Sequence, residues 1–158
     1  MTRIEDIIVW VAALLGLLLM LHGKPASAQS LDDTAKHWGF KASKTVITSI
    51  ENAAKHYGLD SKQMLAIAVI ESSLKPSAIG YNTNGTIDIG LFQINEKTAN
   101  SDCEEYNVFN LKGNVMCAAK LLAKHKKTGD ALYIGRFHNN EITKKYNYYL
   151  KVKKAISK

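Results

Sequence analysis

The chain has 158 residues, of which 46% are apolar and 22% are charged, and its formal net charge is +7. This length suits one domain with a single core, and the absence of repeats or low-complexity tracts excludes a repeat architecture. Residues 1–28 carry no net charge, so the whole positive charge lies on the remainder. A basic protein suits a nucleic acid, an anionic membrane surface or an acidic cell-wall polymer, and charge alone does not choose among them.

The N-terminus resembles an export signal. An uninterrupted apolar run of 15 residues extends from Ile7 to Leu21 and is followed by the small residues 26–28, which predicts a signal peptide over 1–28 cleaved after Ala28. The segment before this run is not clearly positive, and an uncleaved membrane anchor is the alternative, although a bilayer span needs about 20 apolar residues. Either outcome predicts a periplasmic domain, with nucleic acid as the least expected partner and membrane contact only through an uncleaved segment.

Residues 29–42 show no clear period and are predicted to form an irregular arm before a domain at 43–158. In that domain, apolar spacing and capping residues predict helices over 43–58, 60–74, 114–127, 131–137 and 141–156. The pair Asn84-Gly85 predicts a loop or small hairpin between the second and third of these helices. The predicted fold class is therefore mainly α with a minor β element.

The chain has two cysteines, Cys103 and Cys117. In an oxidising compartment they are predicted to form a disulfide that closes a short loop and stabilises the fold by about 2–3 kcal/mol. Two buried thiols that never meet are the alternative, because spacing alone does not fix the geometry of a disulfide.

Glu71 follows the apolar residues of its helix at helical spacing, which places a carboxyl group on an apolar face. Burial of an unpaired carboxylate is costly and raises its pKa, so such a group donates a proton near neutral pH. The alternative is structural: Glu71 lies in solvent, or bonds to a backbone amide or to Lys75 within its own turn.

The order of short motifs carries more information than any single residue. Three segments follow one another along the chain: Glu71-Ser72-Ser73 with Pro76 and Ala78, residues 90–95 (Gly-Leu-Phe-Gln-Ile-Asn), and the helix that begins at Asn114. In this order they resemble the motifs of the soluble lytic transglycosylase family. The small single-domain branch associated with type III and type IV secretion and conjugation is the most similar. The resemblance extends over Ser43 to Val152 and implies a goose-lysozyme-like helical bundle around a cleft.

The resemblance implies Glu71 as the catalytic acid and base, and it implies a set of substrate-binding residues: Ser72, Ser73, Gly90, Phe92, Gln93, Asn95, Phe137, His138 and Tyr148. Gly90 would let the backbone approach the substrate, Phe92 would face a sugar ring, and Gln93 would bind hydroxyl or N-acetyl groups, with a structural bond as the alternative for Gln93. Leu91 and Ile94 are expected in the core. Tyr148 or its neighbour Tyr149 would direct a hydroxyl toward Glu71, with a core aromatic as the alternative.

Several positions depart from the family pattern, among them Asn139 and Asn140, which replace the small residues that commonly follow the motif around Phe137. Phe137 lacks the hydroxyl of the usual Tyr, and Gly80 stands where many relatives have Ser or Asn. These changes leave the acid in place and put in doubt which groups hold the N-acetyl group of the substrate.

The implied activity is cleavage of the MurNAc-GlcNAc bond of peptidoglycan with formation of 1,6-anhydro-MurNAc, without a cofactor. The histidines are scattered, so no metal site is expected. The implied partners are glycan strands and components of a secretion or conjugation apparatus, for which the enzyme would open the wall locally. One alternative is a lysozyme-type hydrolase in which Asp88 helps to activate water. Another is a non-catalytic peptidoglycan-binding assembly module.

Overall fold

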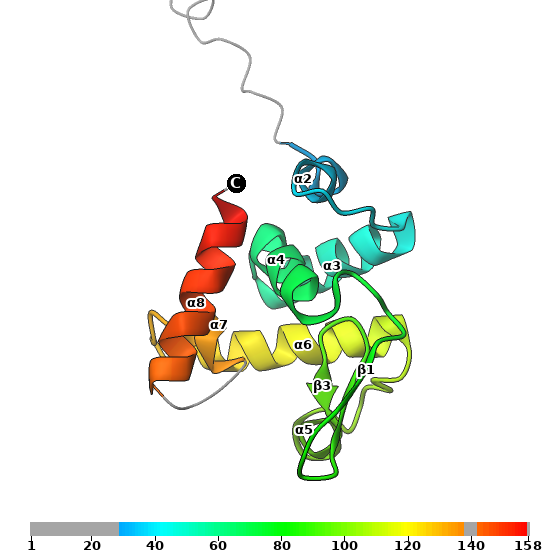
Figure 1. Ribbon diagram of the computed structural model, residues 1–158, viewed down its shortest axis with the longest axis vertical. Coiled ribbons are helices and arrows are strands. Elements are labelled where there is room, and N and C mark those ends of the chain that lie inside the picture. Colours follow the sequence, from blue (N-terminus) through cyan, green and yellow to red (C-terminus); the bar gives the residue numbers. More distant parts are fainter. Residues whose placement is uncertain (1–28, 138–141, 158) are drawn as a thin grey trace, which may run out of the picture.

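The computed structural model describes residues 29–137 and 142–157, which form seven helices and a three-stranded antiparallel sheet. The predicted mainly helical class is confirmed (Figure 1). The apolar run at Ile7–Leu21 lies outside the described residues. Within the described ranges, no helix is both long enough and apolar enough to span a bilayer.

Helix α3 (Lys44–Tyr57) begins and ends where its capping residues predict. Helix α4 (Ser61–Ser72) begins as predicted but ends two residues before the predicted Leu74, because Ser73 adopts a left-handed conformation. Ser43 accepts a hydrogen bond from the amide of Val46, and Gly58 ends α3 in the left-handed conformation, at φ 64°. Asp60 caps α4 by accepting from the amides of Lys62 and Gln63. These local interactions fix the start of the helix that carries Glu71.

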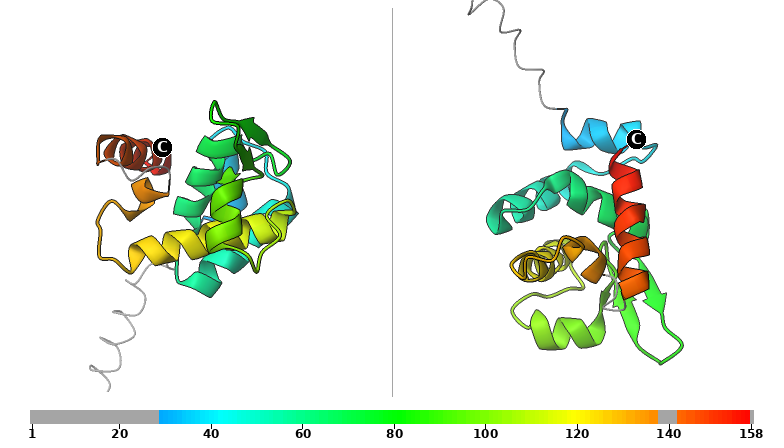
Figure 2. Two further views of the ribbon diagram at one scale, coloured as in Figure 1. Left: turned by 90° about the horizontal axis from the view of Figure 1, so that it is seen from below. Right: turned by 90° about the vertical axis from the view of Figure 1, so that its left-hand side faces the viewer.

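Helix α4 forms the centre of the core. The five consecutive residues from Met64 to Ala68 are all buried. Helices α2, α3 and α8 pack against it (Figures 1 and 2). A helix covered on several sides has little freedom to shift, so residues at its C-terminal end are held in place.

The expectation of an irregular arm over 29–42 is wrong. Leu31–His37 form a helix, α2, whose N-cap Ser30 accepts from the amide of Asp33. Leu31 and Ala35 are buried against the core. The helix is only two turns long and has few apolar residues, so its sequence shows too little periodicity for detection.

The predicted hairpin is present. Strand β1 (Ile79–Tyr81) pairs with β2 (Ile87–Ile89), with Gly80 opposite Asp88. A third strand, β3 (Ile94–Asn95), pairs with β2 and leads directly into α5 (Glu96–Asp102), which sequence patterns did not predict. The sheet and α5 together form a lobe beside the helical core (Figure 1).

Cys103 and Cys117 form a disulfide with 5.5 Å between their Cα atoms, which confirms the predicted bridge. The bond ties the end of α5 to α6 (Leu111–Lys126). Helix α6 begins three residues earlier than its apolar period predicts, because Asn110 supplies the N-cap by accepting from the amide of Gly113.

The last two helices, α7 (Tyr133–Arg136) and α8 (Ile142–Ile156), are joined by a cluster of charges. Asp130 accepts hydrogen bonds from Arg136 at 2.7 Å and from the buried Lys145 at 2.8 Å. Lys145 and Arg136 hold the pKa of Asp130 well below its usual range. Gly135 allows close approach, since a Cβ there would lie 2.0 Å from the backbone oxygen of Lys145. This cluster sets how α8 lies against the core.

Candidate active site

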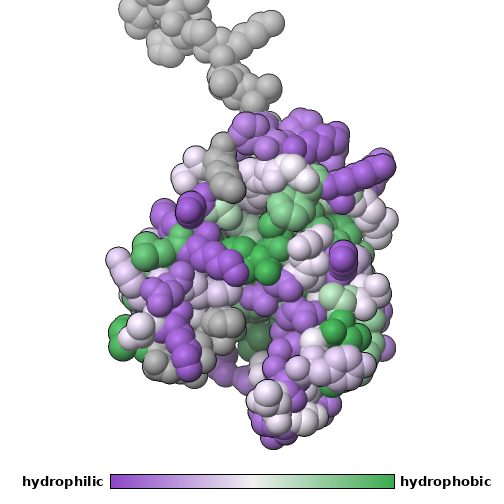
Figure 3. Space-filling model, in the orientation of Figure 1, coloured by the Kyte–Doolittle hydropathy of each residue, from purple (hydrophilic) through white to green (hydrophobic). Residues whose placement is uncertain are grey.

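A cleft of about 480 Å³ opens between the sheet lobe and the helices, and Figure 3 shows the surface hollowed between these parts. Its wall is mostly polar and uncharged, which suits hydroxyl and amide groups of a ligand. The lining residues come from α4, the hairpin, β3, α5, α6 and the end of α7: Glu71, Asn82, Thr83, Asn84, Thr86, Asp88, Gln93, Ile94, Asn95, Thr98, Leu121 and Phe137.

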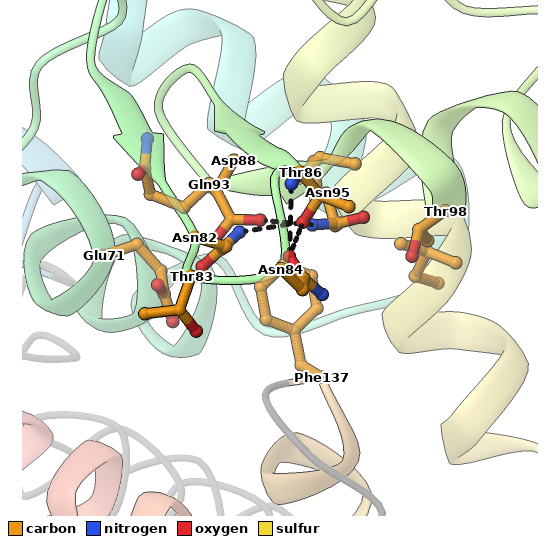
Figure 4. A pocket seen from close by; sticks show the side chains of 12 residues that line it. Glu71, Asn82, Thr83, Asn84, Thr86, Asp88, Gln93, Asn95, Thr98 and Phe137 are labelled. Carbon is orange, nitrogen blue, oxygen red and sulfur yellow. Dashed lines mark hydrogen bonds between the residues drawn. The ribbon is translucent and has the colours of Figure 1, made fainter.

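Glu71 lies in the last turn of α4, is half-buried and directs its side chain to the cleft (Figure 4). The Tyr148 hydroxyl of α8 donates a hydrogen bond to Oε1 of Glu71 at 2.5 Å. Tyr148 is only 5% exposed. Burial and the neighbouring Glu71 carboxyl raise the pKa of Tyr148, so its hydroxyl keeps its proton and acts as the donor.

The end of α4 is tied to the segment that carries Gln93. The buried Ser72 hydroxyl donates to the backbone oxygen of Leu91 at 2.8 Å and accepts from the amide of Lys75. Ser73 is exposed and caps the helix at φ 53°. Neither serine lines the cleft, so the geometry assigns both a role in shaping the helix end.

Strained backbone conformations occur at the end of α4 and at Gln93. The three non-glycine residues with positive φ in the described ranges are Ser73, Leu74 and Gln93, at 53°, 62° and 46°. Such conformations cost about 1–3 kcal/mol each and persist only where surrounding contacts impose them. The turn after α4 and the turn before β3 are therefore held by packing on both sides of the cleft.

Gly90 approaches a side chain of the protein rather than a substrate. Its φ is 74°, and a Cβ would lie 2.6 Å from Nδ2 of Asn114. Asn114 is buried; it donates to the backbone oxygen of Ile89 and accepts from the amide of Phe92. The family-like asparagine at 114 thus holds the turn at Gly90 in shape, and the expectation that Gly90 faces the substrate is corrected.

Phe92 is fully buried, so the expectation that it offers a face to a sugar ring is wrong. Leu91 and Ile94 are buried as expected, although Ile94 also lines the cleft. The ring of Phe137 packs edge-on against Phe92, with 6.2 Å between centroids, and it is Phe137 that lines the cleft. The apolar surface of the cleft therefore comes from Phe137 (Figure 4) together with Ile94 and Leu121.

Gln93 lines the cleft, and its amide nitrogen donates to the backbone oxygens of Ala78 and Gly90 at 3.2 and 2.8 Å. Its Oε1 occupies the space beside Gly80, where a Cβ would lie only 2.8 Å away. The absence of a side chain at 80 thus makes room for Gln93. Gln93 therefore makes structural hydrogen bonds and also lines the cleft, and its Oε1 is the atom that lies toward Gly80.

Hydrogen-bonded polar side chains from the hairpin form one wall of the cleft. The sequence patterns predicted only a turn in this segment. Asn95 donates to Asp88 and to Thr86 at 2.8 and 2.9 Å, and Asn84 and Asn82 bond to the same threonine hydroxyl. Figure 4 shows these bonds converging at the cleft. The signal in the sequence was the density of Asn and Thr around a two-residue turn, which exceeds what a turn needs.

The fold thus brings only some of the predicted site residues together at the cleft. Glu71, Gln93, Asn95 and Phe137 line the cleft, and Tyr148 reaches Glu71 from α8. His138 lies outside the described residues.

Known proteins resemble this chain in sequence. The invasion protein IagB of Salmonella typhimurium (strains SL1344 and LT2) and of Salmonella typhi is 49% identical over 43 residues. The alignment covers 27% of this chain and 27% of each relative, so the chain matches about a quarter of their length. The family of the transglycosylase SLT domain matches residues 48–156, which include α4, the sheet, α6 and α8. The chain belongs to this family, whose members are lytic transglycosylases.

Proposed function

We propose that this protein is a peptidoglycan lytic transglycosylase that cleaves the β-1,4 bond between MurNAc and GlcNAc, with Glu71 as acid and then base. The observation that carries the proposal is the half-buried carboxyl of Glu71 at the cleft, with a buried tyrosine donating to one of its oxygens. A fixed carboxyl group beside neutral polar residues suits proton transfer to an uncharged sugar polymer.

In the first step, the protonated Glu71 gives its proton to the glycosidic oxygen while the bond from that oxygen to C1 of MurNAc breaks. The Tyr148 hydroxyl keeps its proton and holds the carboxyl in one orientation. In the second step, the Glu71 carboxylate takes the proton of the MurNAc 6-hydroxyl, whose oxygen bonds to C1. The product is a 1,6-anhydro ring, water is not consumed, and Glu71 is protonated again for the next cycle.

The test is mass spectrometry of muropeptides released from purified peptidoglycan by the protein and by Glu71→Gln. Anhydro-muropeptides are expected from the wild type, and their release is expected to fall by at least about 1,000-fold in the variant, because a proton donor and acceptor is lost. Glu51→Gln is the matched control, since Glu51 is an exposed residue of α3 away from the cleft. Undiminished release by Glu71→Gln contradicts the assignment of the acid.

Hydrolysis is the second candidate, because Asp88 lines the same cleft as Glu71. The Asn95 amide donates to Oδ1 of Asp88, which fixes that carboxyl in the wall. A second carboxylate that activates water would give hydrated reducing ends in place of anhydro ends. The two products differ in mass by one water. If Asp88 activates that water, Asp88→Asn is expected to abolish the hydrated products, whereas the anhydro products of a transglycosylase would be unaffected.

A non-catalytic wall-binding module is a third candidate, which Phe137 favours because it leaves the cleft without the hydroxyl of the family's usual tyrosine. This function predicts retention on peptidoglycan with no released products, and equal retention of Glu71→Gln and the wild type in a sedimentation assay.

We also propose export to the periplasm and local opening of the wall for a secretion or conjugation apparatus. The apolar run at Ile7–Leu21 supports export, and the name of the Salmonella relatives, invasion protein, supports an apparatus. N-terminal sequencing of the protein from the periplasmic fraction tests cleavage after Ala28. Loss of secretion or conjugation in a deletion strain, restored by the wild type and not by Glu71→Gln, tests the role.

A further inference from the structure

Thr86, the residue before β2, is buried in a part of the cleft wall that is otherwise exposed. It is 4% exposed, whereas Asn82 and Asn84 are exposed and line the cleft. Backbone hydrogen bonds alone close the turn: the amide of Asn82 donates to the oxygen of Thr86 at 2.9 Å, and the amide of Gly85 donates to the oxygen of Asn82 at 3.0 Å. The hydroxyl of Thr86 is therefore not needed to close the turn, and its bonds require another explanation.

The Thr86 hydroxyl uses its full capacity for hydrogen bonds. It donates its proton to Oδ1 of Asn84 at 2.8 Å. It accepts from Nδ2 of Asn82 at 3.2 Å and from Nδ2 of Asn95 at 2.9 Å. A hydroxyl has one donor and two acceptor positions, so all three are occupied. Figure 4 shows the bonds meeting at this residue, which joins three asparagine side chains of one wall.

Backbone amides, which only donate, fix the direction of these bonds. The amide of Lys97 donates to Oδ1 of Asn95, so Nδ2 of Asn95 is the atom that donates to Thr86. The amide of Thr86 donates to Oδ1 of Asn84 at 3.1 Å, and the same oxygen accepts the hydroxyl proton. With that proton used, Thr86 meets Asn82 only as an acceptor. The orientation of each amide therefore follows from its neighbours.

Two atoms of this wall remain for a ligand, the acceptor Oδ1 of Asn82 and the donor Nδ2 of Asn84. Neither atom has a hydrogen-bond partner within the described part of the chain, and both residues line the cleft. A secondary amide has its carbonyl and its N–H on opposite edges of one plane, so it can meet a donor and an acceptor on different side chains. A hydroxyl has both functions on a single oxygen. The wall therefore suits an amide substituent better than a plain sugar hydroxyl.

We infer that Thr86 is a positioning residue, whose hydroxyl orients Asn82 and Asn84 so that this wall binds an acetamido group of the glycan. The inference rests on the proposed function, because it takes an N-acetylated sugar polymer as the ligand of the cleft. Thr86 is buried and acts through the two asparagines without touching the ligand. The N-acetyl group is thus assigned to the hairpin, in a cleft where Phe137 and Gly80 lack polar side-chain atoms.

The first test is calorimetric binding in the Glu71→Gln background, so that turnover does not interfere. The ligands are the β-1,4 tetramer of N-acetylglucosamine and cellotetraose, which has a hydroxyl in place of each acetamido group and is equally uncharged. The N-acetylated tetramer is expected to bind at least about fivefold more tightly, the level that one or two neutral hydrogen bonds contribute. Equal binding of the two tetramers overturns the inference.

Thr86→Val replaces the hydroxyl by a methyl group and is expected to bring the affinities for the two tetramers within about twofold of each other. Thr86→Ser keeps the hydroxyl and should keep the preference. Thr34→Val is the matched control, since Thr34 is also 4% exposed, and its hydroxyl donates to the oxygen of Ser30 in α2, away from the cleft. An equal loss in both valine variants, or an unchanged preference in Thr86→Val, overturns the inference.

Asn84→Asp tests the cleft-facing donor without removing the bonds to Thr86. The aspartate keeps an oxygen that accepts from Thr86 but has an oxygen in place of Nδ2, so the melting temperature should stay within a few degrees and the preference should be lost. Asn52→Asp is the control, because it adds the same charge on an exposed position of α3. A preference retained in Asn84→Asp, or lost equally in Asn52→Asp, contradicts the assignment.

Turnover by the protein with Glu71 intact separates this inference from the proposed function. In Thr86→Val, KM for N-acetylated strands is expected to rise at least about fivefold with kcat within about twofold of the wild type, because the bonds of Thr86 do not include Glu71. Anhydro products formed with an unchanged KM, or with only kcat reduced, would keep the transglycosylase and overturn the role of Thr86. A binding preference lost in Thr86→Val, without products from any strand, would support that role and overturn the proposed enzyme.

Discussion

Replacement of Tyr148 by Phe tests how the fold serves the proposed acid. The ring is 5% exposed and would be kept, so the change removes one hydroxyl that donates to Glu71 at 2.5 Å. A hydrogen bond to a charged group contributes about 1.5–3 kcal/mol, and about 1.4 kcal/mol corresponds to tenfold in rate. If this bond orients the carboxyl for both proton transfers, kcat is expected to fall by about 10- to 100-fold with little change in KM.

The assay is the initial rate of anhydro-muropeptide release from strands of defined length, with thermal unfolding measured in parallel. Tyr149→Phe is the control, because it removes the same atom from the next residue of α8, which does not line the cleft. The melting temperatures of both variants should stay within a few degrees of the wild type. A kcat for Tyr148→Phe within twofold of the wild type, at equal stability, would refute the view that this bond orients Glu71.

Three further predictions concern stability. Gly90→Ala is expected to cost more than about 2 kcal/mol in urea unfolding, whereas Gly85→Ala should cost only about 1 kcal/mol, because both have positive φ but only the first meets a buried side chain. Reduction of the bond between Cys103 and Cys117 should lower the free energy of unfolding by about 2–3 kcal/mol, measured with and without dithiothreitol. The pKa of Asp130 is lower in the folded protein than its value of about 4 in the unfolded chain, so this carboxylate stabilises the fold above pH 4 and the stabilisation is lost as the pH falls. In Asp130→Asn, the melting temperature should therefore depend less on pH between about pH 2 and 6 than in the wild type.

Sequence patterns predicted what depends on neighbours along the chain. The caps of α3 and α4 lie within three residues of the amides they satisfy, and the hairpin turn depends on two residues. Helix α2 was missed because its two turns bury only a few residues, and α5 because it has one buried residue, Ala99. Elements this short are held by contacts with the rest of the fold, which local patterns do not contain.

The site residues, too, were predicted where the signal is local in the sequence and missed where it is not. Glu71 was identifiable because its position on an apolar helix and its motif are local, and Gln93 because it belongs to a six-residue motif. The motifs did not reveal which of their residues face the cleft. Phe92 is buried and Ser72 bonds to Leu91, whereas Phe137, which lacks the hydroxyl of the family's usual Tyr, lines the cleft as expected. A motif of this kind records the packing that forms the cleft as much as the residues that line it.

The partnership between Glu71 and Tyr148 shows why the remainder needed a structure. The two residues are 77 positions apart, and they meet because α8 packs against α4. The position of α8 depends in turn on the pairing of Asp130 with Lys145, three residues before Tyr148 on the same helix. The orientation of the acid therefore depends on an ion pair that takes no part in the chemistry.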